Sequence, residues 1–456
     1  MQTIPALFEH QQRTVKLLGE STSVFDMSDP GTGKTRSALV GFLNRFKADN
    51  DGKCALVLAP KSILKSAWGN DIKKFTPELV FSIAYASNRE AAFKADANVY
   101  ITNIDATKWL YKQKPEFFDK FSTIIIDEGT FYKHQTSARS KALAKIIKYF
   151  KFRELMTGTP NSNTITDIWH QVYLLDGGAR LGKSFYAFRA TACIPKQVGP
   201  SPNMVKWVDR PGVHEAVASL LSDITIRHKF EECTDIPANY EYTVPFDMST
   251  KHRGHYDELR KTSVLELQSG DVSAIHAASL ATKLLQVASG AAYGETLQGS
   301  KDRYINIDND RYEMVIDIAN QREHSIVFFL WTHQRDELVK QATASGLTYA
   351  VIDGDTSDSK REEIVEFYQK GIYRILFAHP ASAAHGLTLV KGTATIWASP
   401  PHNLDWFVQG NRRIYRTGQT AKTETIIIVA TGTIEEKVYE SLMNKNINMQ
   451  TLLGMV

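Results

Sequence analysis

The sequence has little cysteine, no long apolar run and no marked excess of charge of one sign. Its 456 residues include three scattered cysteines, Cys54, Cys193 and Cys233, and no CxxC pair. This pattern argues against a disulfide framework and against a structural zinc site. Apolar runs such as Thr123–Ile126 are far too short to span a bilayer. No signal peptide pattern is present near the start, so we expect a cytoplasmic protein, in a bacterium or a phage-infected host.

The charge balance limits the kind of surface that could bind a polyanion. The formal net charge is only +4, so any surface for nucleic acid must be a local basic patch. Hydrophobic residues make up 43% and charged residues 23% of the chain, as in ordinary globular proteins. A chain of this length is expected to form two or three domains.

Short apolar runs that end in loop residues occur in two groups, with helical patterns between them. Buried parallel strands have this character, so we predict an α/β fold with two mainly parallel sheets. The first group is Cys54–Pro60, Asn98–Asn103, Ser122–Asp127 and Phe152–Pro160. The second group is Ser325–Trp331, Leu347–Gly354, Tyr373–Pro380, Thr393–Pro400 and Glu424–Thr431.

The sequence between the two groups of predicted strands has first an irregular and then a helical pattern, which suggests five segments. The residues rich in Gly, Pro and Lys after Gly177 predict a surface excursion. We predict a first lobe over 1–176, an insertion and helical extension of that lobe over 177–235, and an extended linker over 236–249. A helical segment attached to the second lobe is predicted over 250–300, and the second lobe itself over 301–456.

The stretch SDPGTGKT, Ser28–Thr35, has the composition of a phosphate-binding loop between a strand and a helix. Gly31 and Gly33 permit the tight backbone that aims N–H groups at phosphate oxygens. Lys34 would reach the β and γ phosphates, and Thr35 would hold Mg²⁺. The helix that follows would present its positive N-terminus to the same anion. A chance glycine-rich turn is the less favoured alternative.

Two later motifs strengthen this interpretation. Asp127 and Glu128 follow an apolar strand, where an aspartate can hold Mg²⁺ and a glutamate can polarise the attacking water. Thr157–Pro160, TGTP, ends another strand and offers hydroxyls that could sense a phosphate, although it also fits a plain turn.

An arginine pair near the end of the second group points to phosphoryl transfer. Arg413 and Arg416 are three residues apart, so on a helix they would share a face. A solvated basic helix end is the ordinary explanation of such a pair. The functional one is a pair of arginine fingers that stabilise charge on the transferred phosphoryl group. Fingers on a separate lobe would make catalysis depend on closure of the two lobes.

The order of these motifs resembles superfamily 2 helicases and translocases over nearly the whole chain. Within them the chain is most similar to the Swi/Snf-type DNA translocases, on the basis of Thr157–Trp169, Ile226–Phe230, the RxxRxGQ ending and Thr433–Val438. The phage branch-migration helicases are a nearby alternative. The motifs in order are His10–Gln11, Asp29–Thr35, Leu58–Trp68, Asp127–Thr130, Thr157–Pro160, Ala383–Leu389 and Gln409–Gln419.

The resemblance implies two RecA-like lobes with ATP and Mg²⁺ between them. It implies Gln11 for the adenine, Thr35 and Asp127 for the metal, Glu128 for catalysis, and Gly386 near both ATP and DNA. The nucleotide-binding loop would comprise Asp29, Pro30, Gly31, Thr32, Gly33, Lys34 and Thr35, and the second lobe would add Gln409, Arg413 and Arg416. The chain departs from the family pattern at Ser28, Thr130, Ala384 and Thr388, where glycine, His or Asp, glycine and asparagine are common.

Contacts with DNA are expected at the carboxyl ends of strands, where α/β folds place ligands. The candidates are Lys61, Ser62, Thr102, Asn103, Thr332 and His333. Trp68 and Trp331 could stack on bases, although such tryptophans are more often part of the core. The lysine-rich excursion from Lys183 to Lys206 is either a second duplex contact or a solvated loop.

The predicted function is a DNA-dependent ATPase that moves along duplex or branched DNA, remodelling forks or junctions or displacing bound proteins. We expect a monomer whose further partners are replication or recombination proteins. The alternatives are a viral DNA-packaging motor with a nuclease half, an RNA helicase and a catalytically silent scaffold. Lys34, Asp127 and Glu128 are all present, which argues against the scaffold.

Overall fold

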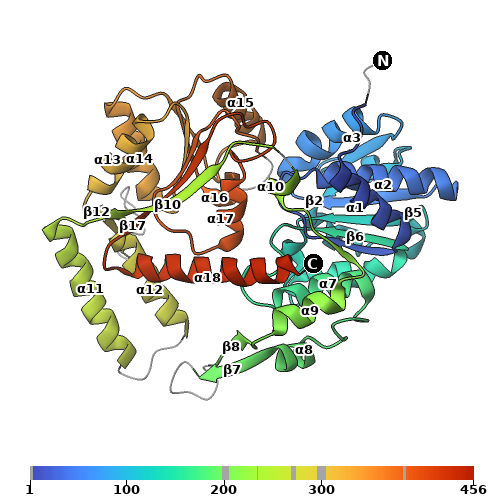
Figure 1. The fold of residues 1–456 in the computed structure, drawn as a ribbon, viewed down its shortest axis with the longest axis horizontal. Helices are drawn as coiled ribbons and strands as arrows, with labels where there is room; N and C mark the ends of the chain where they lie inside the picture. The colour runs from blue at the N-terminus through green and yellow to red at the C-terminus, as the bar shows by residue number, and fades with distance from the viewer. Residues whose placement is uncertain are drawn as a thin grey trace. The chain divides into compact units, whose positions relative to one another are not determined.

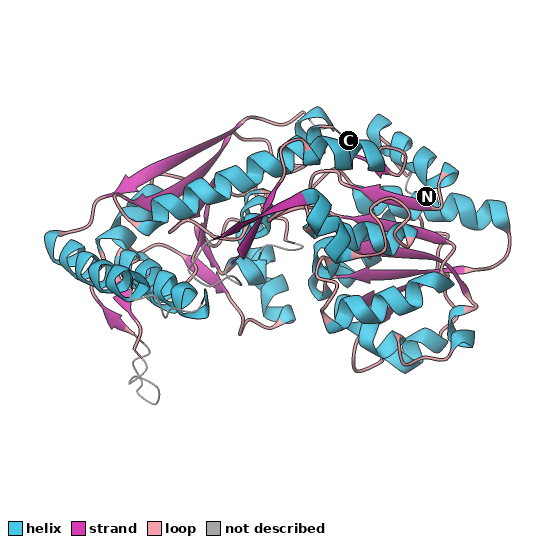
Figure 2. Cartoon of the chain, turned by 90° about the horizontal axis from the view of Figure 1, so that it is seen from below, coloured by secondary structure: helices cyan, strands magenta, loops and turns pink. Residues whose placement is uncertain are grey.

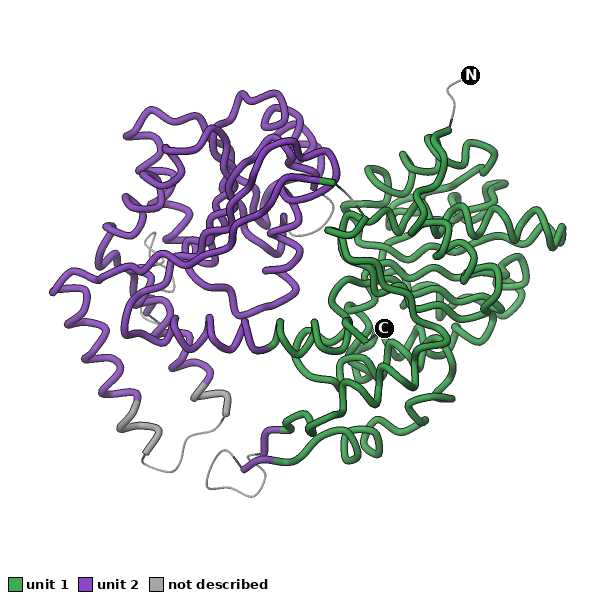
Figure 3. The backbone as a smooth tube through the Cα atoms, in the orientation of Figure 1, with its two compact units in different colours: residues 1–195, 207–235, 445–456 green, residues 196–206, 236–444 purple. Residues whose placement is uncertain are grey.

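The chain forms two compact units, shown in Figure 3. The computed structural model describes residues 4–197, 205–233, 235–268, 274–294, 304–383 and 387–455. Unit 1 comprises Met1–Pro195, Trp207–Asp235 and Lys445–Val456, and unit 2 comprises Lys196–Lys206 and Ile236–Asn444. Within the described residues, none of the helices combines the length and the apolar character that crossing a membrane requires.

Unit 1 is built on a seven-stranded sheet in which every recorded strand pairing is parallel. Its central strands are apolar and buried on both faces, as expected when helices cover both sides of a parallel sheet. In spatial order the strands are β3 (Phe81–Ala84), β4 (Val99–Asn103), β2 (Cys54–Ala59), β5 (Phe121–Asp127), β6 (Phe152–Met156), β1 (Ser23–Asp26) and β9 (Thr225–Ile226).

Helices connect these strands and flank the sheet (Figures 1 and 2). They are α1 (Glu9–Glu20), α2 (Lys34–Asp49), α3 (Asn70–Phe75), α4 (Arg89–Lys94), α5 (Thr107–Leu110), α6 (Ala138–Ile146), α7 (Asp167–Asp176), α8 (Phe185–Ala192), α9 (Val213–Leu221) and α10 (Phe230–Cys233). A two-stranded ribbon of β7 (Cys193–Gln197) and β8 (Val205–Asp209) lies between α8 and α9 in the chain.

Unit 2 has a six-stranded sheet whose recorded pairings are also parallel. Its order is β10 (Asn239–Phe246), β17 (Thr423–Ala430), β16 (Ala394–Trp397), β13 (Ser325–Phe328), β15 (Ile375–Ala378) and β14 (Tyr349–Ile352). The other elements are α11 (Thr250–Gln268), α12 (Ala274–Ala288), β11 (Ala291–Ala292), β12 (Ile305–Asn306), α13 (Asp310–Asn320), α14 (Thr332–Ala344), α15 (Asp358–Gln369), α16 (Pro380–Ala383), α17 (Leu404–Asn411) and α18 (Ile434–Gly454).

The predicted fold class, two α/β units with mainly parallel sheets, is confirmed. The structure adds detail to the predicted segments in three places. Part of the predicted extended linker forms β10, which pairs along its whole length with β17 in the sheet of unit 2. β9 comes from the predicted insertion and extension of the first lobe, and it pairs with β1 in the main sheet of unit 1. The last residues, from Lys445, are grouped with unit 1 and not with unit 2.

The motif Thr433–Val438, which supported the family resemblance, has a structural role in unit 2. Glu435 is fully buried and forms a two-pronged ion pair with Arg311 on α13, at 2.9 and 3.0 Å. The same carboxylate accepts a hydrogen bond from the backbone N–H of Ala430. Thr433 donates to the Ala430 carbonyl at 2.8 Å. These bonds join the end of β17, the start of α18 and α13.

We expect Glu435→Gln to lower the free energy of unfolding by about 3–5 kcal/mol, because breaking a buried ion pair leaves an uncompensated charge on Arg311. Urea denaturation of the full chain measures this change. The neighbouring exposed carboxylate provides the matched control, since Glu436→Gln should change stability little. Equal stability of the two variants would contradict the assigned role of Glu435.

Candidate nucleotide site

The loop from Met27 to Gly33 connects β1 to α2 and has the backbone of a phosphate cradle. Gly31 and Gly33 have φ angles of 92° and 83°, a region that residues with a Cβ rarely adopt. A Cβ on Gly33 would lie only 2.3 Å from Nε2 of Gln11. Conformation therefore favours glycine there, and the side chain of the predicted adenine-binding Gln11 lies against the loop.

Lys34 begins α2 and its side chain folds over the loop. Its Nζ donates hydrogen bonds to the carbonyl oxygens of Ser28 and Asp29, at 2.6 and 3.1 Å. These neutral partners orient the ammonium without cancelling its charge. An oriented lysine charge, a helix N-terminus and two glycines at positive φ together fit a phosphate group.

Ser28, at a position where the resemblance led us to expect glycine, holds the loop to residues 228–230 of unit 1. Its Oγ accepts a hydrogen bond from the backbone N–H of His228 at 3.0 Å. Asp29 Oδ2 accepts from the N–H of Phe230 at 3.1 Å, and the N–H of Asp29 donates to the His228 carbonyl at 3.0 Å. Arg227 lies 3.7 Å from Asp29 Oδ1. These contacts give Asp29 a role in positioning the loop, and its role as a nucleotide ligand stays a prediction.

Two histidine side chains, those of His10 and His228, also lie near the loop. His10 shares a hydrogen bond with the Thr32 carbonyl at 2.8 Å, and its ring lies edge-on to that of His228 at 5.3 Å. His228 bonds Thr14 at 2.9 Å, and burial lowers its pKa. Sequence reasoning missed His228 as part of this arrangement. Its only signal was the motif Ile226–Phe230, which had suggested family membership.

We expect Asp29→Ala to raise the KM for ATP about tenfold with a smaller effect on kcat, because a hydrogen bond to a charged group contributes about 1.5–3 kcal/mol. The variant would lose the hydrogen bond from the Phe230 N–H to Asp29 Oδ2, which holds the loop in place, while Lys34 would remain. Steady-state ATPase kinetics measure this split. Glu232→Ala, at an exposed carboxylate of α10, is the control and should change neither constant. A fall in kcat with unchanged KM would argue against a positioning role.

The acid pair predicted at the end of β5 is placed at the carboxyl edge of the same sheet. Asp127 is buried and its Oδ2 accepts a hydrogen bond from Trp68 Nε1 at 2.9 Å. Burial raises the pKa of Asp127, and the Trp68 hydrogen bond and the charge of Lys34 oppose this shift. The effect of Lys34 on this pKa indicates that the predicted phosphate and metal ligands share one electrostatic environment.

Glu128 has a left-handed backbone, with φ 57° and ψ 61°. Among the described residues the only other non-glycine with positive φ is Asn50, a residue type that adopts this region more readily. Backbone strain of this kind is concentrated at functional sites. The next residue must be glycine for a different reason, because a Cβ on Gly129 would lie 2.1 Å from Leu155 Cδ2.

The TGTP motif lies between the other two motifs, because β6 separates β1 from β5 in the sheet. The backbone N–H of Thr157 donates to the Asp26 carbonyl at 3.0 Å. A Cβ on Gly158 would lie 2.8 Å from Pro30 Cδ, so this turn packs directly on the phosphate loop. Three neighbouring strands thus bring all three predicted motifs of unit 1 to one edge.

The structure corrects three of the predicted DNA contacts. Trp68 lies in a π-helical turn, Leu64–Gly69, and is fully buried, so its ring cannot stack on a base. Thr102 is fully buried and donates to the Ala84 carbonyl. His333 is 1% exposed and bonds Ser289 and Tyr293. Thr102 points into the core because successive residues of a strand alternate between its faces. Trp68 and His333 lie instead on the buried sides of the π-helical turn and of α14.

The remaining predicted contacts are accessible. Lys61 is exposed, and partly exposed are Ser62, Asn103, Thr332 and Trp331. Asn103 also accepts a hydrogen bond from Arg89 at 3.0 Å. Lys61 and Ser62 follow β2, and Asn103 ends β4, so these residues share the carboxyl edge of the sheet in unit 1.

Unit 2 brings together Gln409, Arg413 and Arg416, although not in the way that the spacing suggested. α17 ends at Asn411, so the two arginines lie in the turn after the helix and do not share a helical face. Arg413 donates to the backbone and side-chain oxygens of Gln409, at 2.7 and 2.9 Å. Both guanidinium groups donate to the Leu387 carbonyl, Arg413 at 3.1 Å and Arg416 at 2.9 Å.

The two arginines differ in exposure. Arg413 is 5% exposed, whereas Arg416 is partly exposed. Leu387 belongs to the predicted motif Ala383–Leu389, so this motif and the arginine motif contact each other directly. Gly386, predicted to lie near ATP and DNA, falls outside the described residues, as do residues 198–204 of the lysine-rich excursion.

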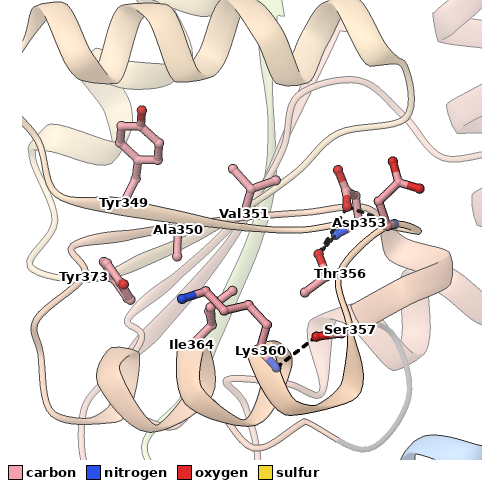
Figure 4. Close-up of a pocket in the computed structure, with 10 residues that line it drawn as sticks. Tyr349, Ala350, Val351, Asp353, Thr356, Ser357, Lys360, Ile364 and Tyr373 are labelled. Atoms are coloured by element: carbon pink, nitrogen blue, oxygen red, sulfur yellow. Dashed lines mark hydrogen bonds between the residues drawn. The ribbon is translucent and has the colours of Figure 1, made fainter.

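Unit 2 also contains a hollow that none of these motifs contributes to. It has a volume of about 440 Å³ and lies beside the edge strand β14 and the start of α15 (Figure 4). Tyr349, Asp353, Lys360 and Tyr373 are among its lining residues. Thr356 closes a turn with the backbone N–H of Asp353, and Ser357 caps α15. Its residues are therefore separate from the predicted nucleotide-binding residues.

Comparison with known proteins places these motifs in a family. The model of the SNF2-related domain matches residues 10–289, and that of the helicase conserved C-terminal domain matches residues 310–418. Protein p41 of Acyrthosiphon pisum secondary endosymbiont phage 1 is 29% identical over 93% of this chain and 92% of its own length.

Cellular relatives are longer. A protein described as an ATP-dependent helicase/translocase, YwqA of Bacillus subtilis, is 24% identical over 91% of this chain and 45% of its own length. The human SWI/SNF-related matrix-associated actin-dependent regulator of chromatin subfamily A member 1 is 23% identical over 90% of this chain and 40% of its own length. The chain thus spans less than half of these two relatives.

A solved structure of the Sulfolobus solfataricus SWI2/SNF2 ATPase core in complex with double-stranded DNA covers 99% of this chain, with 19% identity and a TM-score of 0.45. The family models match both units, which are therefore RecA-like lobes, and the motifs follow one another in the expected order. The chain belongs to the SNF2-related family of superfamily 2 ATP-dependent helicases and translocases.

Proposed function

We propose that this enzyme couples ATP hydrolysis to movement along duplex DNA. The observation that carries this proposal is the distribution of motifs between two parallel sheets. Unit 1 holds the phosphate loop and the acid pair, and unit 2 holds the arginine cluster around Leu387. A reaction that requires groups from both units can be linked to their relative movement.

The residues of unit 1 fit a nucleotide with a magnesium ion. Gly31, Gly33 and Lys34 would hold the phosphates, Thr35 and Asp127 would hold Mg²⁺, and Gln11 would contact the adenine. Bound Mg²⁺ supplies charge neutralisation for the phosphate oxygens during transfer. Trp68 positions Asp127 by its hydrogen bond to one carboxylate oxygen, so the other oxygen keeps a defined orientation.

Glu128 is the proposed general base. A base must lie within hydrogen-bond reach of the water it activates and must keep a fixed orientation. The left-handed backbone at Glu128 and the packed Gly129 direct this side chain differently from an ordinary strand continuation. Its neighbour Asp127 is then free to hold the metal, so the two carboxylates have separate tasks.

Arg416 is the proposed arginine finger, and Arg413 is proposed to position it. Arg413 is buried and donates hydrogen bonds to both Gln409 and Leu387, whereas Arg416 is partly exposed and donates to the Leu387 carbonyl. A guanidinium that stabilises charge on the transferred phosphoryl group must be able to reach outside its own unit. This assignment refines the prediction that both arginines are catalytic.

Duplex DNA is the proposed track, contacted through its phosphates by Lys61, Ser62, Asn103 and Thr332. Phosphate contacts carry no sequence information, which is what stepping along DNA requires. Remodelling of forks and junctions, branch migration and displacement of bound proteins are the proposed outcomes of this movement. The helicase C-terminal match over 310–418 favours this proposal over a packaging motor with a nuclease half.

ATP turnover with different nucleic acids tests the proposal. We expect duplex, forked and four-way-junction DNA to stimulate turnover, with single-stranded DNA and duplex RNA as comparisons. Stimulation by RNA alone would replace the proposal with an RNA helicase. Turnover that no DNA changes would contradict a DNA-driven motor.

A further inference from the structure

The ribbon formed by β7 and β8 presents a basic and apolar face that the proposed mechanism does not use. The ribbon consists of Cys193–Gln197 and Val205–Asp209. Figure 1 shows it next to α8, and Figure 3 shows that the ribbon residues 196–197 and 205–206 are grouped with unit 2. The inference below rests on the proposed movement along DNA.

The base of the ribbon is well anchored in unit 1. Asp209 accepts a hydrogen bond from the backbone N–H of Ile165 at 3.0 Å and lies 3.3 Å from His214. The Cys193 thiol lies 3.6 Å from the other oxygen of Asp209. The N–H of Arg210 donates to the Ala192 carbonyl at 3.0 Å. Asp209 therefore serves internal contacts.

The alternation along the strands defines an outer face. Cys193 and Asp209 touch each other, so they share one face of the ribbon. Successive residues of a strand point to opposite faces. The opposite face consequently carries Ile194 and Lys196 from β7 and Lys206 and Val208 from β8. All four are exposed, and Ile194 and Val208 are 44% and 42% exposed to solvent.

Positive charge is concentrated in this part of the chain. Residues 183–212 contain five basic side chains and one acidic side chain, Asp209. The local excess of four equals the net charge of the whole chain. Within the described residues none of the five has a carboxylate within ion-pair distance, whereas the flanking Arg180 pairs with Asp176 and Asp223. The five are Lys183, Arg189, Lys196, Lys206 and Arg210.

Aromatic rings hold one of these charges in place. The Arg189 guanidinium lies 4.3 Å from the centre of the Trp207 ring and 5.4 Å from that of Tyr186. These contacts tie α8 to the inner face of β8. Tyr186 is 66% exposed. The contact between Arg189 and Trp207 lies on the inner face of the ribbon, so it fixes the ribbon while the outer face stays exposed.

We propose that the outer face of the ribbon is a second contact surface for duplex DNA, apart from the strand-end residues named above. A two-stranded β-ribbon fits the major groove, lysines pair with phosphates, and exposed aliphatic side chains can contact sugars and base edges. Cations without carboxylate partners favour a polyanion such as duplex DNA, whose phosphates carry closely spaced negative charges. Such a contact would raise affinity for duplex DNA without taking part in hydrolysis.

The test is the double variant Lys196→Glu/Lys206→Glu. Its matched control, Lys148→Glu/Lys151→Glu, makes the same charge change at two exposed lysines. These lysines precede β6 and so lie at the amino-terminal end of that strand. We expect the ribbon variant to bind a short DNA duplex on the order of tenfold more weakly, and its salt dependence to fall by about 2 in slope. Fluorescence anisotropy across a salt series measures both. ATP turnover without DNA should be unchanged in both variants.

Each outcome has a defined meaning. If wild-type turnover responds to DNA but the ribbon variant binds duplex DNA as the control does, the ribbon inference is wrong and the proposed function survives. If the ribbon variant loses affinity for duplex RNA and keeps it for duplex DNA, the inference is also overturned. If DNA neither binds nor stimulates the wild type, the proposed function itself fails. A selective loss of duplex DNA binding supports the inference.

Discussion

Lys34→Ala should abolish DNA-stimulated ATP hydrolysis and weaken ATP binding. Lys34 provides an ammonium that two loop carbonyls orient without neutralising it. Removing one charged group that stabilises a transition state costs roughly 10²–10³ in rate. Lys47→Ala is the matched control, because Lys47 lies on the same helix and pairs with Glu78 at the surface. Retained activity in Lys34→Ala would remove this loop from the proposed site.

Glu128→Gln should separate binding from chemistry. Loss of a general base lowers turnover by roughly 10²–10⁴. ATP affinity should stay close to that of the wild type, because the phosphate loop and Asp127 are unchanged. Turnover and nucleotide binding measured on the same preparation make the comparison, with the exposed Glu116→Gln as control. A variant that hydrolyses ATP normally would show that Glu128 is not the base.

Arg416→Ala should lower kcat by roughly 10³ or more while ATP binding survives, because an arginine finger acts mainly in the transition state. The thermal midpoint should change little, since Arg416 is partly exposed. Arg413→Ala should also lower turnover and should in addition lower the midpoint. The difference arises because Arg413 is buried and donates three hydrogen bonds to Gln409 and Leu387.

Arg412→Ala is the control for both arginines, because Arg412 is adjacent and its guanidinium stacks on the Tyr415 ring. Normal kcat in Arg416→Ala would exclude it as a finger. A selective loss of kcat in Arg413→Ala, with stability intact, would assign the finger to Arg413. The two assignments are therefore distinguishable with three variants and two measurements.

Motif order and apolar periodicity were sufficient to predict much of this molecule. Strands such as β2, β5 and β17 are short apolar runs bounded by loop residues, so their positions follow from local composition. The phosphate loop was predictable as well, because Gly31 and Gly33 are needed for backbone reasons that do not depend on distant residues. The family matches confirm the predicted membership.

Residues whose roles depend on side-chain direction were not predictable in this way. Thr102 lies in β4, His333 lies in the first turn of α14 and Trp68 lies in the π-helical turn Leu64–Gly69, and all three side chains are buried. Burial depends on which face of the strand or helix a residue occupies and on what packs there. The spacing of Arg413 and Arg416 predicted a shared helical face, and this prediction is wrong because it depended on where the helix ends. α17 ends before them, and the shared Leu387 carbonyl brings them together instead.

The sequence by itself determined the fold class, the phosphate loop, the acid pair and the family, because these depend on local patterns and on their order. Only the tertiary structure decided that Ser28 and Asp29 anchor the loop to residues 228–230, about two hundred positions later. It also decided that Trp68 orients Asp127 and that Glu435 pairs with Arg311. These contacts join residues far apart in the chain, and which distant groups meet is set by strand order and packing.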